Sequence, residues 1–229
     1  MPSSAQSSGV RTSVAPPSGG PTDDGQVRGA RLPREARRAQ LLDAANEVFT
    51  TRGYHAAAMD EIAAAAGISK PVLYQHFDSK LELYLALLDR ACDALVDVVQ
   101  GALTSTDDNA ERVVAVIGAF YDFVSSASGE FRFVFESDLT GDGRVQERLW
   151  RVNQEVADAI AAVIVEDTRL PLEQAKLLAS SLVGLAQVGA RSWVSDRSAA
   201  IGLEQAKQLV STLAWRGISG FPLHDARDA

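Results

Sequence analysis

The sequence predicts an all-α protein. Apolar residues after Pro33 recur at helical spacing, the alternation typical of strands is nearly absent, and breaks rich in Gly, Pro, Ser or Asp separate the helical patterns. We expect about nine helices, with three N-terminal helices in a helix-turn-helix arrangement and a larger helical domain after them. The segment FRFVF (131–135) alternates like a strand, but a lone strand would have no partner, so we assign it to a helix as well.

The composition indicates a substantial core without covalent cross-links. Hydrophobic residues make up 46% of the 229 residues, enough for one large domain or two small ones. Cys92 is the only cysteine, which excludes an intramolecular disulfide and, together with the lack of a signal-peptide pattern, indicates a cytoplasmic protein. The most apolar stretch (177–190) contains two serines and a glutamine and is too short to cross a bilayer, so we expect no membrane contact.

Charge is distributed unevenly along the chain. The net charge is −8, but residues 1–80 hold nine Lys/Arg and eight Asp/Glu, whereas residues 81–229 hold 13 and 22. Segment 26–38 (QVRGARLPREARR) alone holds five Arg and one Glu. An acidic protein of this kind can still present one basic face to a polyanion, although a basic run taken alone is about as often merely solvated.

Each expected helix has recognisable ends. Residues 1–30 are half Ser, Pro and Gly and predict a disordered tail. The first helix is marked by the helical spacing of Leu41, Ala45, Val48 and Phe49, and Gly53 ends it. The predicted helices are 34–52, about 59–66, about 70–77, 80–104, 109–127, 130–139, 143–167, 171–195 and 200–217.

The proline in the third helix is compatible with a helix start. Gly67 ends the second helix, and Ser69 can cap the third by accepting a hydrogen bond from a first-turn N–H. Pro71 then falls in the first turn, where backbone N–H groups have no partner within the helix. The sequence SKLE (79–82) has the form of a capping box and starts the fourth helix.

The second and third helices, joined by an Ala-Gly-Ile turn, form a helix-turn-helix pattern, although a plain helical bundle with a tight corner would look similar. Val72, Leu73 and Phe77 can pack on the first two helices, although Val72, near the exposed start, can instead reach a base, and the other side chains of the third helix face outward. Gln can read adenine, Pro or Val can touch a thymine methyl, and Tyr, His or Lys can bind phosphates. The residues available for DNA are Lys70, Pro71, Val72, Tyr74, Gln75, His76 and Lys80.

Residues 44–88 closely resemble the DNA-binding domain of the TetR family of bacterial regulators, through A-x-x-x-F with a following G-Y, then D-E-I-A-x-x-A-G-I-S-K-x-x-L-Y-x-H-F and S-K-x-x-L. The resemblance implies a homodimer that binds a palindromic operator in double-stranded DNA, and a variable C-terminal domain that binds a ligand and dimerises. It places Ser69, Lys70, Pro71, Val72 and Gln75 at the major groove and Tyr74, His76 and Lys80 on phosphates.

One position departs from the family pattern. The family often has Thr or Ser where this chain has Ala58, just before the second helix. Ala58 can neither cap the helix nor bond a phosphate, and a lost cap costs about 0.5–2 kcal/mol. Either Asp60 and Glu61 in the first turn compensate through the helix dipole, or the contact is missing.

The basic segment before the first helix has a functional interpretation. Arg31, Arg34, Arg37 and Arg38 precede or open that helix. We interpret them as an arm that reaches phosphates or the minor groove, as in other DNA-binding domains with basic extensions, and Arg34 and Arg38 as its contacts. A merely solvated run is the alternative.

The chain after residue 90 is rich in apolar and aromatic residues. Any one of them is more often core than ligand contact, and the lone thiol is more often a small buried apolar group than a redox sensor. As a group they fit an apolar pocket between helices. The ligand-binding candidates are Cys92, Leu95, Phe120, Phe123, Phe131, Phe135 and Trp150.

The last two predicted helices suit dimerisation. Their small residues allow close helix approach and their tryptophans can anchor a seam, whereas internal packing is the alternative. The resemblance to the TetR family implies an interface of four helices, two from each subunit. The interface candidates are Ala179, Gly184, Ala186, Trp193 and Trp215.

A narrower resemblance extends beyond the DNA-binding domain. Segments 53–63, 69–88, 131–138 and 214–223 are together similar to the actinobacterial TetR-type regulators of fatty acid synthesis. This resemblance implies a lipophilic small-molecule effector such as long-chain acyl-CoA. Candidates for binding the CoA phosphates are Arg132, Arg144, Arg148 and Arg151.

The function best predicted is that of a ligand-responsive, sequence-specific transcriptional regulator, not an enzyme. Three scattered His, no G-x-S-x-G and no Gly-rich phosphate loop predict no catalytic residue, no metal ligand and no cofactor. The alternatives are a TetR-type repressor of an efflux or catabolic operon that senses another apolar molecule, and a ligand-free architectural DNA-binding protein. The expected regions are 1–30 (tail), 31–92 (DNA binding), 93–222 (ligand binding and dimerisation) and 223–229 (flexible C-terminus).

Overall fold

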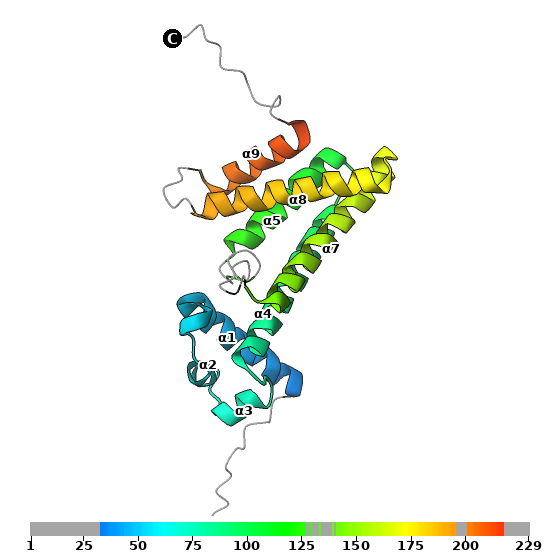
Figure 1. Ribbon diagram of the computed structural model, residues 1–229. Coiled ribbons are helices and arrows are strands. Elements are labelled where there is room, and N and C mark those ends of the chain that lie inside the picture. Colours follow the sequence, from blue (N-terminus) through cyan, green and yellow to red (C-terminus); the bar gives the residue numbers. More distant parts are fainter. Residues whose placement is uncertain are drawn as a thin grey trace, which may run out of the picture. The chain divides into compact units, whose positions relative to one another are not determined.

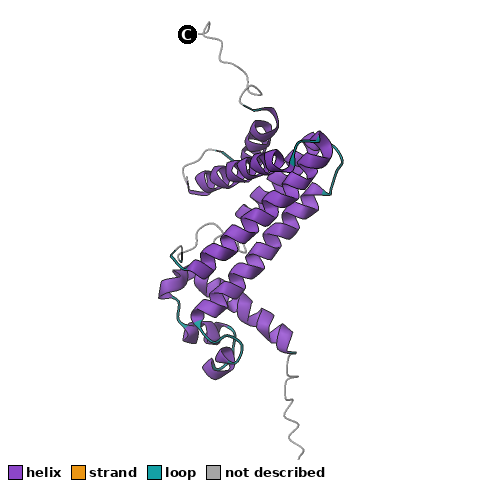
Figure 2. Cartoon of the chain, turned by 45° about the vertical axis from the view of Figure 1, so that its right-hand side comes forward, coloured by secondary structure: helices purple, strands orange, loops and turns teal. Residues whose placement is uncertain are grey.

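The computed structural model contains eight α-helices and no strand among the residues that it describes (Figure 1, Figure 2), which confirms the all-α class. The predicted tail (1–30), the predicted C-terminal segment (223–229) and nearly all of the predicted helix 130–139 lie outside those residues. The helices are α1 (Arg34–Ala56), α2 (Met59–Ala65), α3 (Lys70–Tyr74), α4 (Lys80–Leu103), α5 (Asn109–Ser125), α7 (Gly143–Thr168), α8 (Leu172–Ser195) and α9 (Leu203–Arg216). The described residues are 33–126, 129, 133, 139, 141–195 and 201–217.

α1 breaks at Gly53, where the sequence predicts its end. Gly53 has φ 76° and ψ 164°, a conformation that a glycine adopts without a Cβ clash, and a short turn continues to Ala56. On the inner side of α1, Leu41, Ala45 and Phe49 are buried, as their spacing predicts, while Val48 is partly buried against the same core. They belong to the continuous core that the N-terminal helices share with α4.

The turn between α2 and α3 is held by backbone hydrogen bonds. The N–H of Gly67 donates to the carbonyl of Ala64 and the N–H of Ile68 to the carbonyl of Ala63, each at 3.0 Å. With φ +66° at Gly67, this is a Schellman motif, which ends α2 and turns the chain. α3 follows with Leu73 fully buried in the core, so the turn and that one anchor fix the direction of α3.

Only one of the two predicted capping serines forms its cap. Ser79 accepts a hydrogen bond from the N–H of Glu82 at 3.1 Å. Ser69 occupies the N-cap position of α3, but its side chain makes no capping bond, so that prediction is wrong. Of the two usual donors, Pro71 has no N–H, and the N–H of Val72 donates to the Ser69 carbonyl at 3.0 Å.

α4 joins the two predicted domains without a break. Because it runs from Lys80 to Leu103, the predicted boundary at residue 92 falls within one helix. α4 packs on α1 near its start and on α5 and α7 further along, where α4 and α7 lie side by side (Figure 2). α8 packs on α7, and α9 packs on α5 and α8. α4 therefore contacts both α1, on which α2 packs, and the helices of the C-terminal bundle.

Alanines form a second, smaller core between α7 and α8. Ala157 and Ala161 on α7 meet Ala175 and Ala179 on α8, and all four are buried. Side chains of this size let the two helices approach closely. In the described segments no helix combines the length and apolarity that crossing a membrane requires.

Candidate DNA-binding surface and ligand cavity

α3 is anchored on one side and open on the other. Leu73 is buried on the inner side, and Phe77 is buried just after the helix. The opposite side carries hydrogen-bonding groups at the spacing that a recognition helix presents to a groove. Of the candidates for DNA on and around α3, Ser69, Lys70, Pro71, Tyr74 and Gln75 are exposed, and Val72, His76 and Lys80 are partly buried.

Lys70 forms an ion pair with the neighbouring helix. Its Nζ lies 2.8 Å from Oδ1 of Asp60, and both side chains are more than half exposed. The hydrogen bond to Asp60 is the main cause that raises the pKa of Lys70. Because an exposed pair of this kind is weak, Lys70 can exchange Asp60 for an acceptor on DNA at little cost.

His76 lies beside the arginines that open α1. Burial lowers the pKa of His76, and the positive charges of Arg34, Arg37 and Arg38 lower it further. Arg38 and His76 line the same surface pocket, and the Arg38 guanidinium lies 4.7 Å from the centroid of the Phe77 ring, so residues some forty positions apart in sequence form one basic cluster next to α3. Arg34 and Arg38 are exposed there, while Arg31 of the predicted arm lies outside the described residues.

Lys80 points away from the position that the sequence predicts. Its Nζ donates to the carbonyls of Tyr54 at 2.8 Å, Ala57 at 2.9 Å and His55 at 3.3 Å, and it lies 4.5 Å from the centroid of the Tyr54 ring. The last carbonyls of a helix lack N–H partners within it, and an ammonium with three donors can satisfy them. In this structure Lys80 therefore binds the end of α1 and is not poised for a phosphate.

The start of α2 is stabilised without a capping side chain at Ala58. The N–H of Ala58 donates to Oε2 of Glu61 at 3.2 Å, and Oε1 of Glu61 accepts from Arg52 at 2.5 Å. Glu61 thus offsets part of the missing cap through a hydrogen bond, in addition to its favourable position in the helix dipole. Because Ala58 has no hydroxyl, it cannot make the phosphate contact that a Thr or Ser at this position would make.

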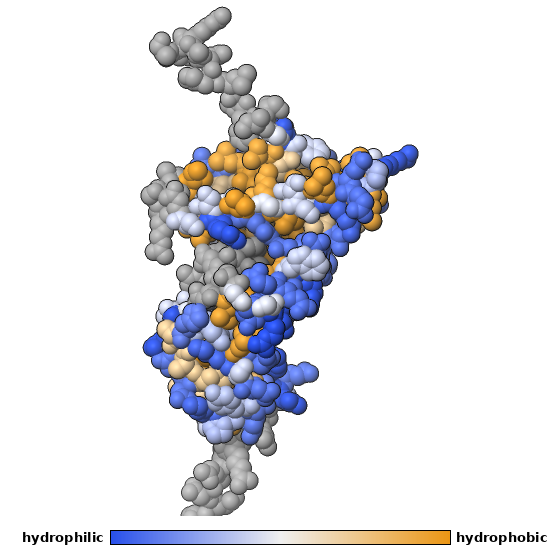
Figure 3. Space-filling model, in the orientation of Figure 1, coloured by the Kyte–Doolittle hydropathy of each residue, from blue (hydrophilic) through white to orange (hydrophobic). Residues whose placement is uncertain are grey.

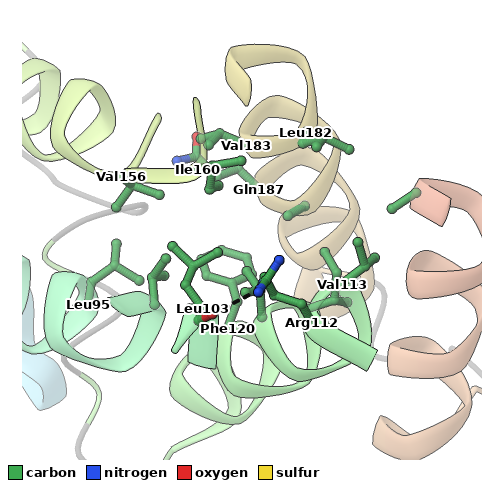
Figure 4. A pocket seen from close by; sticks show the side chains of 15 residues that line it. Leu95, Leu103, Arg112, Val113, Phe120, Val156, Ile160, Leu182, Val183 and Gln187 are labelled. Carbon is green, nitrogen blue, oxygen red and sulfur yellow. Dashed lines mark hydrogen bonds between the residues drawn. The ribbon is translucent and has the colours of Figure 1, made fainter. Parts of the chain in front are cut away.

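An apolar cavity of about 90 Å³ lies mainly between α4, α5, α7 and α8 (Figure 4). Its walls are aliphatic apart from one phenylalanine and two polar residues. Helix positions that face a cavity have the same apolar periodicity as positions that face a core, which is why the sequence did not single most of them out. The apolar lining residues are Leu95, Val99, Leu103, Val113, Val116, Ile117, Phe120, Val156, Ile160, Leu182, Val183, Ala186 and Ala214.

Two polar side chains, Arg112 and Gln187, lie on opposite walls of the cavity (Figure 4). Arg112 donates from Nε to the carbonyl of Leu103 at 3.0 Å and from a terminal nitrogen to Oδ2 of Asp167 at 3.0 Å. The Nε2 of Gln187 donates to Oδ1 of Asn153 at 2.5 Å. Each polar group therefore has a partner in the protein, as groups next to an apolar space require.

The predicted aromatic pocket is only partly the observed one. Leu95 and Phe120 line the cavity, but Phe123 is packed into the core and Trp150 stands 66% exposed on α7. The clustering of aromatic residues in sequence did not carry over to one site, because successive positions of a helix face different directions. Outside the described residues lie Phe131 and Phe135.

Cys92 is also absent from the lining of this cavity. It is buried on α4, and burial is the largest of the effects that raise the pKa of its thiol to about 12. A thiol with so high a pKa is protonated at neutral pH and is a poor nucleophile. The structure therefore gives Cys92 the surroundings of a small apolar core residue, the alternative to a redox sensor that the sequence favours.

The arginines suggested for CoA phosphates are engaged elsewhere. Arg144 pairs with Glu82 at 2.9 Å and Arg148 with Asp89 at 2.6 Å, so both join α7 to α4. Arg151 lies 3.3 Å from a glutamate one turn earlier in α7. The pairs of Arg144 and Arg151 are weak because both side chains are more than half exposed, whereas Arg148 is only 25% exposed and is held more firmly by Asp89. The fourth candidate, Arg132, lies outside the described residues.

Exposed apolar side chains gather over α8 and α9 (Figure 3). They include Leu177 and Val188 on α8 and Leu209 and Trp215 on α9. A contiguous exposed apolar surface is typical of a protein–protein interface. We call this surface the α8–α9 face.

Only some of the predicted interface residues belong to that face. Trp215 is half exposed and Gly184 partly exposed. The sequence predicts that Ala179 and Ala186 lie in the dimer interface. Both are instead buried within the subunit, because Ala179 lies on the side of α8 that packs on α7 and Ala186 lines the cavity. Trp193 packs on Tyr121 at 5.8 Å between ring centroids.

Comparison with known proteins agrees with this architecture. The model of the bacterial regulatory proteins of the tetR family matches residues 41–87. The HTH-type transcriptional activator FasR of Mycolicibacterium smegmatis is 46% identical over 200 residues, which cover 87% of this chain and 90% of FasR.

Two solved structures have a similar fold. A TetR-like regulator from Rhodococcus sp. RHA1 is 30% identical with a TM-score of 0.62, over 83% of this chain and 100% of that one. The regulator FadR of Bacillus subtilis, solved with stearoyl-CoA, is 17% identical with a TM-score of 0.66, over 79% and 98%. The chain therefore belongs to the tetR family of bacterial regulatory proteins, and it is a DNA-binding transcriptional regulator, not an enzyme.

Proposed function

We propose that this chain is a cytoplasmic, homodimeric regulator of fatty acid metabolism whose sequence-specific DNA binding is controlled by long-chain acyl-CoA. The observation that carries the proposal is the apolar cavity, since α4, which forms one of its walls, also packs on α1, and α1 in turn packs on α2 of the helix-turn-helix. Two similarities support it. The sequence resembles actinobacterial regulators of fatty acid synthesis, and FadR, solved with stearoyl-CoA, has the same fold.

The proposed DNA contacts divide into two classes. On the exposed side of α3, Gln75 and Lys70 offer groups that pair with base edges, and Pro71 offers an apolar contact for a thymine methyl. Tyr74 and the basic cluster, with Arg34, Arg38 and His76, surround that face with phosphate contacts. Phosphate contacts position the protein, whereas the central groups of α3 select the sequence.

A dimer would present two such faces to DNA. Two symmetric recognition helices meet half-sites about 34–36 Å apart, or a multiple of that distance, so the operator should be palindromic. An operator can be selected from a random duplex pool by the purified protein. Replacing one half-site with random sequence should lower the affinity more than tenfold. An unchanged affinity would contradict binding by two symmetric recognition helices.

The size of the cavity suggests how an effector acts. Sites for drug-sized ligands occupy roughly 300–1,000 Å³, whereas this cavity holds about 90 Å³. A long acyl chain therefore fits only if the walls formed by α4, α5, α7 and α8 move apart. A ligand that binds the widened state better shifts the population towards it, and α4 carries the change to the DNA-binding helices.

Thermal denaturation with palmitoyl-CoA, free CoA and palmitate tests the effector class. We expect a saturable rise in Tm with palmitoyl-CoA, no rise with free CoA, and a change in operator affinity at the same palmitoyl-CoA concentrations. If no acyl compound stabilises the protein, the effector proposal fails. Stabilisation by unrelated apolar molecules alone would favour a regulator of an efflux or catabolic operon instead.

A further inference from the structure

We propose that Lys80 is a positioning residue that ties the first turn of α4 to the corner between α1 and α2, and so makes the DNA-binding helices follow the sensor helix. We define the α1–α2 corner as residues 53–58. Lys80 sits at the first position of α4, and its side chain reaches back over more than twenty residues of sequence to this corner.

The contacts of Lys80 use its whole ammonium group. It donates to three carbonyls of the corner, at 2.8 Å (Tyr54), 2.9 Å (Ala57) and 3.3 Å (His55), so all three N–H donors of the lysine have acceptors. The same nitrogen lies 4.5 Å from the centre of the Tyr54 ring, which adds a cation–π contact. Such a set of contacts fixes the corner relative to α4 in both distance and direction.

The corner is also held by packing, since Ala57 is only 3% exposed and the Tyr54 ring lies 5.2 Å from the ring of Tyr84 on α4. Gly53 breaks the helix, and the N–H of Ala57 returns to the Gly53 carbonyl only through a long bond of 3.3 Å. Ala58 provides no side-chain cap for α2, and its N–H is satisfied by Glu61 at 3.2 Å. Lys80 adds to this packing three hydrogen-bond donors from outside the corner, and these orient the carbonyls of the corner relative to α4.

The other end of the same helix lines the cavity. Leu95, Val99 and Leu103 form part of the cavity wall, and the 24 residues of α4 join them to Lys80 through a continuous helix. A helix of this length spans about 36 Å and transmits a tilt or shift from one end to the other. The transmission of an effector signal rests on the proposed function, whereas the tie between α4 and the corner does not.

This role differs measurably from a phosphate contact. A lysine that neutralises a phosphate releases a counterion, so its loss lowers the slope of log K against log salt concentration by about one. A lysine that only positions the helices leaves the number of neutralised phosphates unchanged. Its loss therefore weakens binding without changing the salt slope.

The test compares the full-length wild type with Lys80→Met, which keeps the apolar stem against Tyr54, and Lys80→Arg, which keeps a cation with several donors. Three quantities are measured: amide hydrogen exchange in residues 53–58, the salt slope on the selected operator, and the ratio of operator affinities with and without palmitoyl-CoA. For Lys80→Met we expect at least tenfold faster exchange, an operator affinity about tenfold lower with an unchanged salt slope, and a ratio close to one. Lys80→Arg should restore most of the affinity and of the response to palmitoyl-CoA.

A salt slope reduced by about one, or unchanged exchange in residues 53–58, would overturn the positioning role. If Lys80→Met does not fold by circular dichroism, Lys80→Gln, which keeps two amide donors, takes its place in the same three measurements. If the wild type fails to bind palmitoyl-CoA, the acyl-CoA proposal fails on its own, and the exchange and the salt slope still decide the role of Lys80.

Discussion

Arg112 on α5 donates to Asp167 on α7 across 3.0 Å at the edge of the apolar cavity, and the same side chain donates to the carbonyl of Leu103 at the end of α4. One guanidinium therefore joins three of the helices that wall the cavity. The Arg112 side chain is only 13% exposed, so its partners would be left in a partly dry environment if it were removed.

Replacing Arg112 with Met should destabilise the protein, because the apolar stem remains but Asp167 and the Leu103 carbonyl lose their donor. We expect the free energy of unfolding to fall by about 1–3 kcal/mol. Arg151→Met is the matched control, since Arg151 is largely exposed, pairs within its own helix and should change stability by less than about 0.5 kcal/mol. Urea unfolding measures both variants, and equal effects would contradict the special role of Arg112.

Filling the cavity should abolish effector binding without unfolding the protein. Val116 lines the cavity and Val114, two positions earlier on α5, is exposed. Val116→Phe places a ring where the acyl chain would lie, so the rise in Tm with palmitoyl-CoA should disappear while operator binding persists. Val114→Phe makes the same chemical change outside the cavity and should keep the wild-type response. An unaltered response in Val116→Phe would mean that the effector binds elsewhere.

The turn between α2 and α3 requires glycine at position 67 because of its backbone conformation and not because a side chain would lack space. Gly67 has φ +66°, yet a Cβ there would meet no atom within 4 Å. Gly67→Ala should therefore cost about 1–2 kcal/mol through the left-handed backbone and lower operator affinity with it. Gly118→Ala, in the middle of α5 and equally free of close neighbours, should instead stabilise by about 0.5–1 kcal/mol. Thermal unfolding separates the two, and a stabilising Gly67→Ala would refute the turn geometry.

The α8–α9 face should mediate dimerisation. Trp215 on that face is 50% exposed, and Trp150, on α7, is 66% exposed. A charge buried in an interface is strongly unfavourable, so Trp215→Glu should weaken the dimer at least tenfold and reduce binding to the palindromic operator. Trp150→Glu should leave the dimer intact. Sedimentation equilibrium measures the dimer affinity of both variants. Dissociation of the Trp150 variant alone would show that the interface lies elsewhere than the α8–α9 face.

His76 should make stability depend on pH in a defined direction. Burial and the neighbouring arginines lower its pKa, so the folded state favours the neutral imidazole. The contribution of His76 to the free energy of unfolding is therefore fully present above its pKa in the unfolded chain, about 6.5. It is lost as the pH falls towards the lower pKa of His76 in the folded protein. Between about pH 8 and pH 5, wild type should lose more unfolding free energy than His76→Asn. Parallel curves for the two proteins would contradict this assignment.

The sequence by itself determined the features that depend on short stretches of chain. The spacing of Leu41, Ala45 and Phe49 indicates a buried helix face, and the structure buries all three. Gly53 and Gly67 mark breaks that the backbone makes with positive φ. The inward side of α3 at Leu73 also follows from periodicity, since a helix turns by a constant angle per residue.

The tertiary structure alone decided which groups meet across the chain. Lys80 turns back to the carbonyls of the α1–α2 corner, and Ala186 faces the cavity where the sequence favoured a dimer surface. Arg148, suggested for phosphate, finds Asp89 on another helix. Periodicity gives the apolar side of a helix but not the neighbour that covers it. A core, a cavity and an interface all present the same pattern in sequence, and only the packing of distant helices distinguishes them.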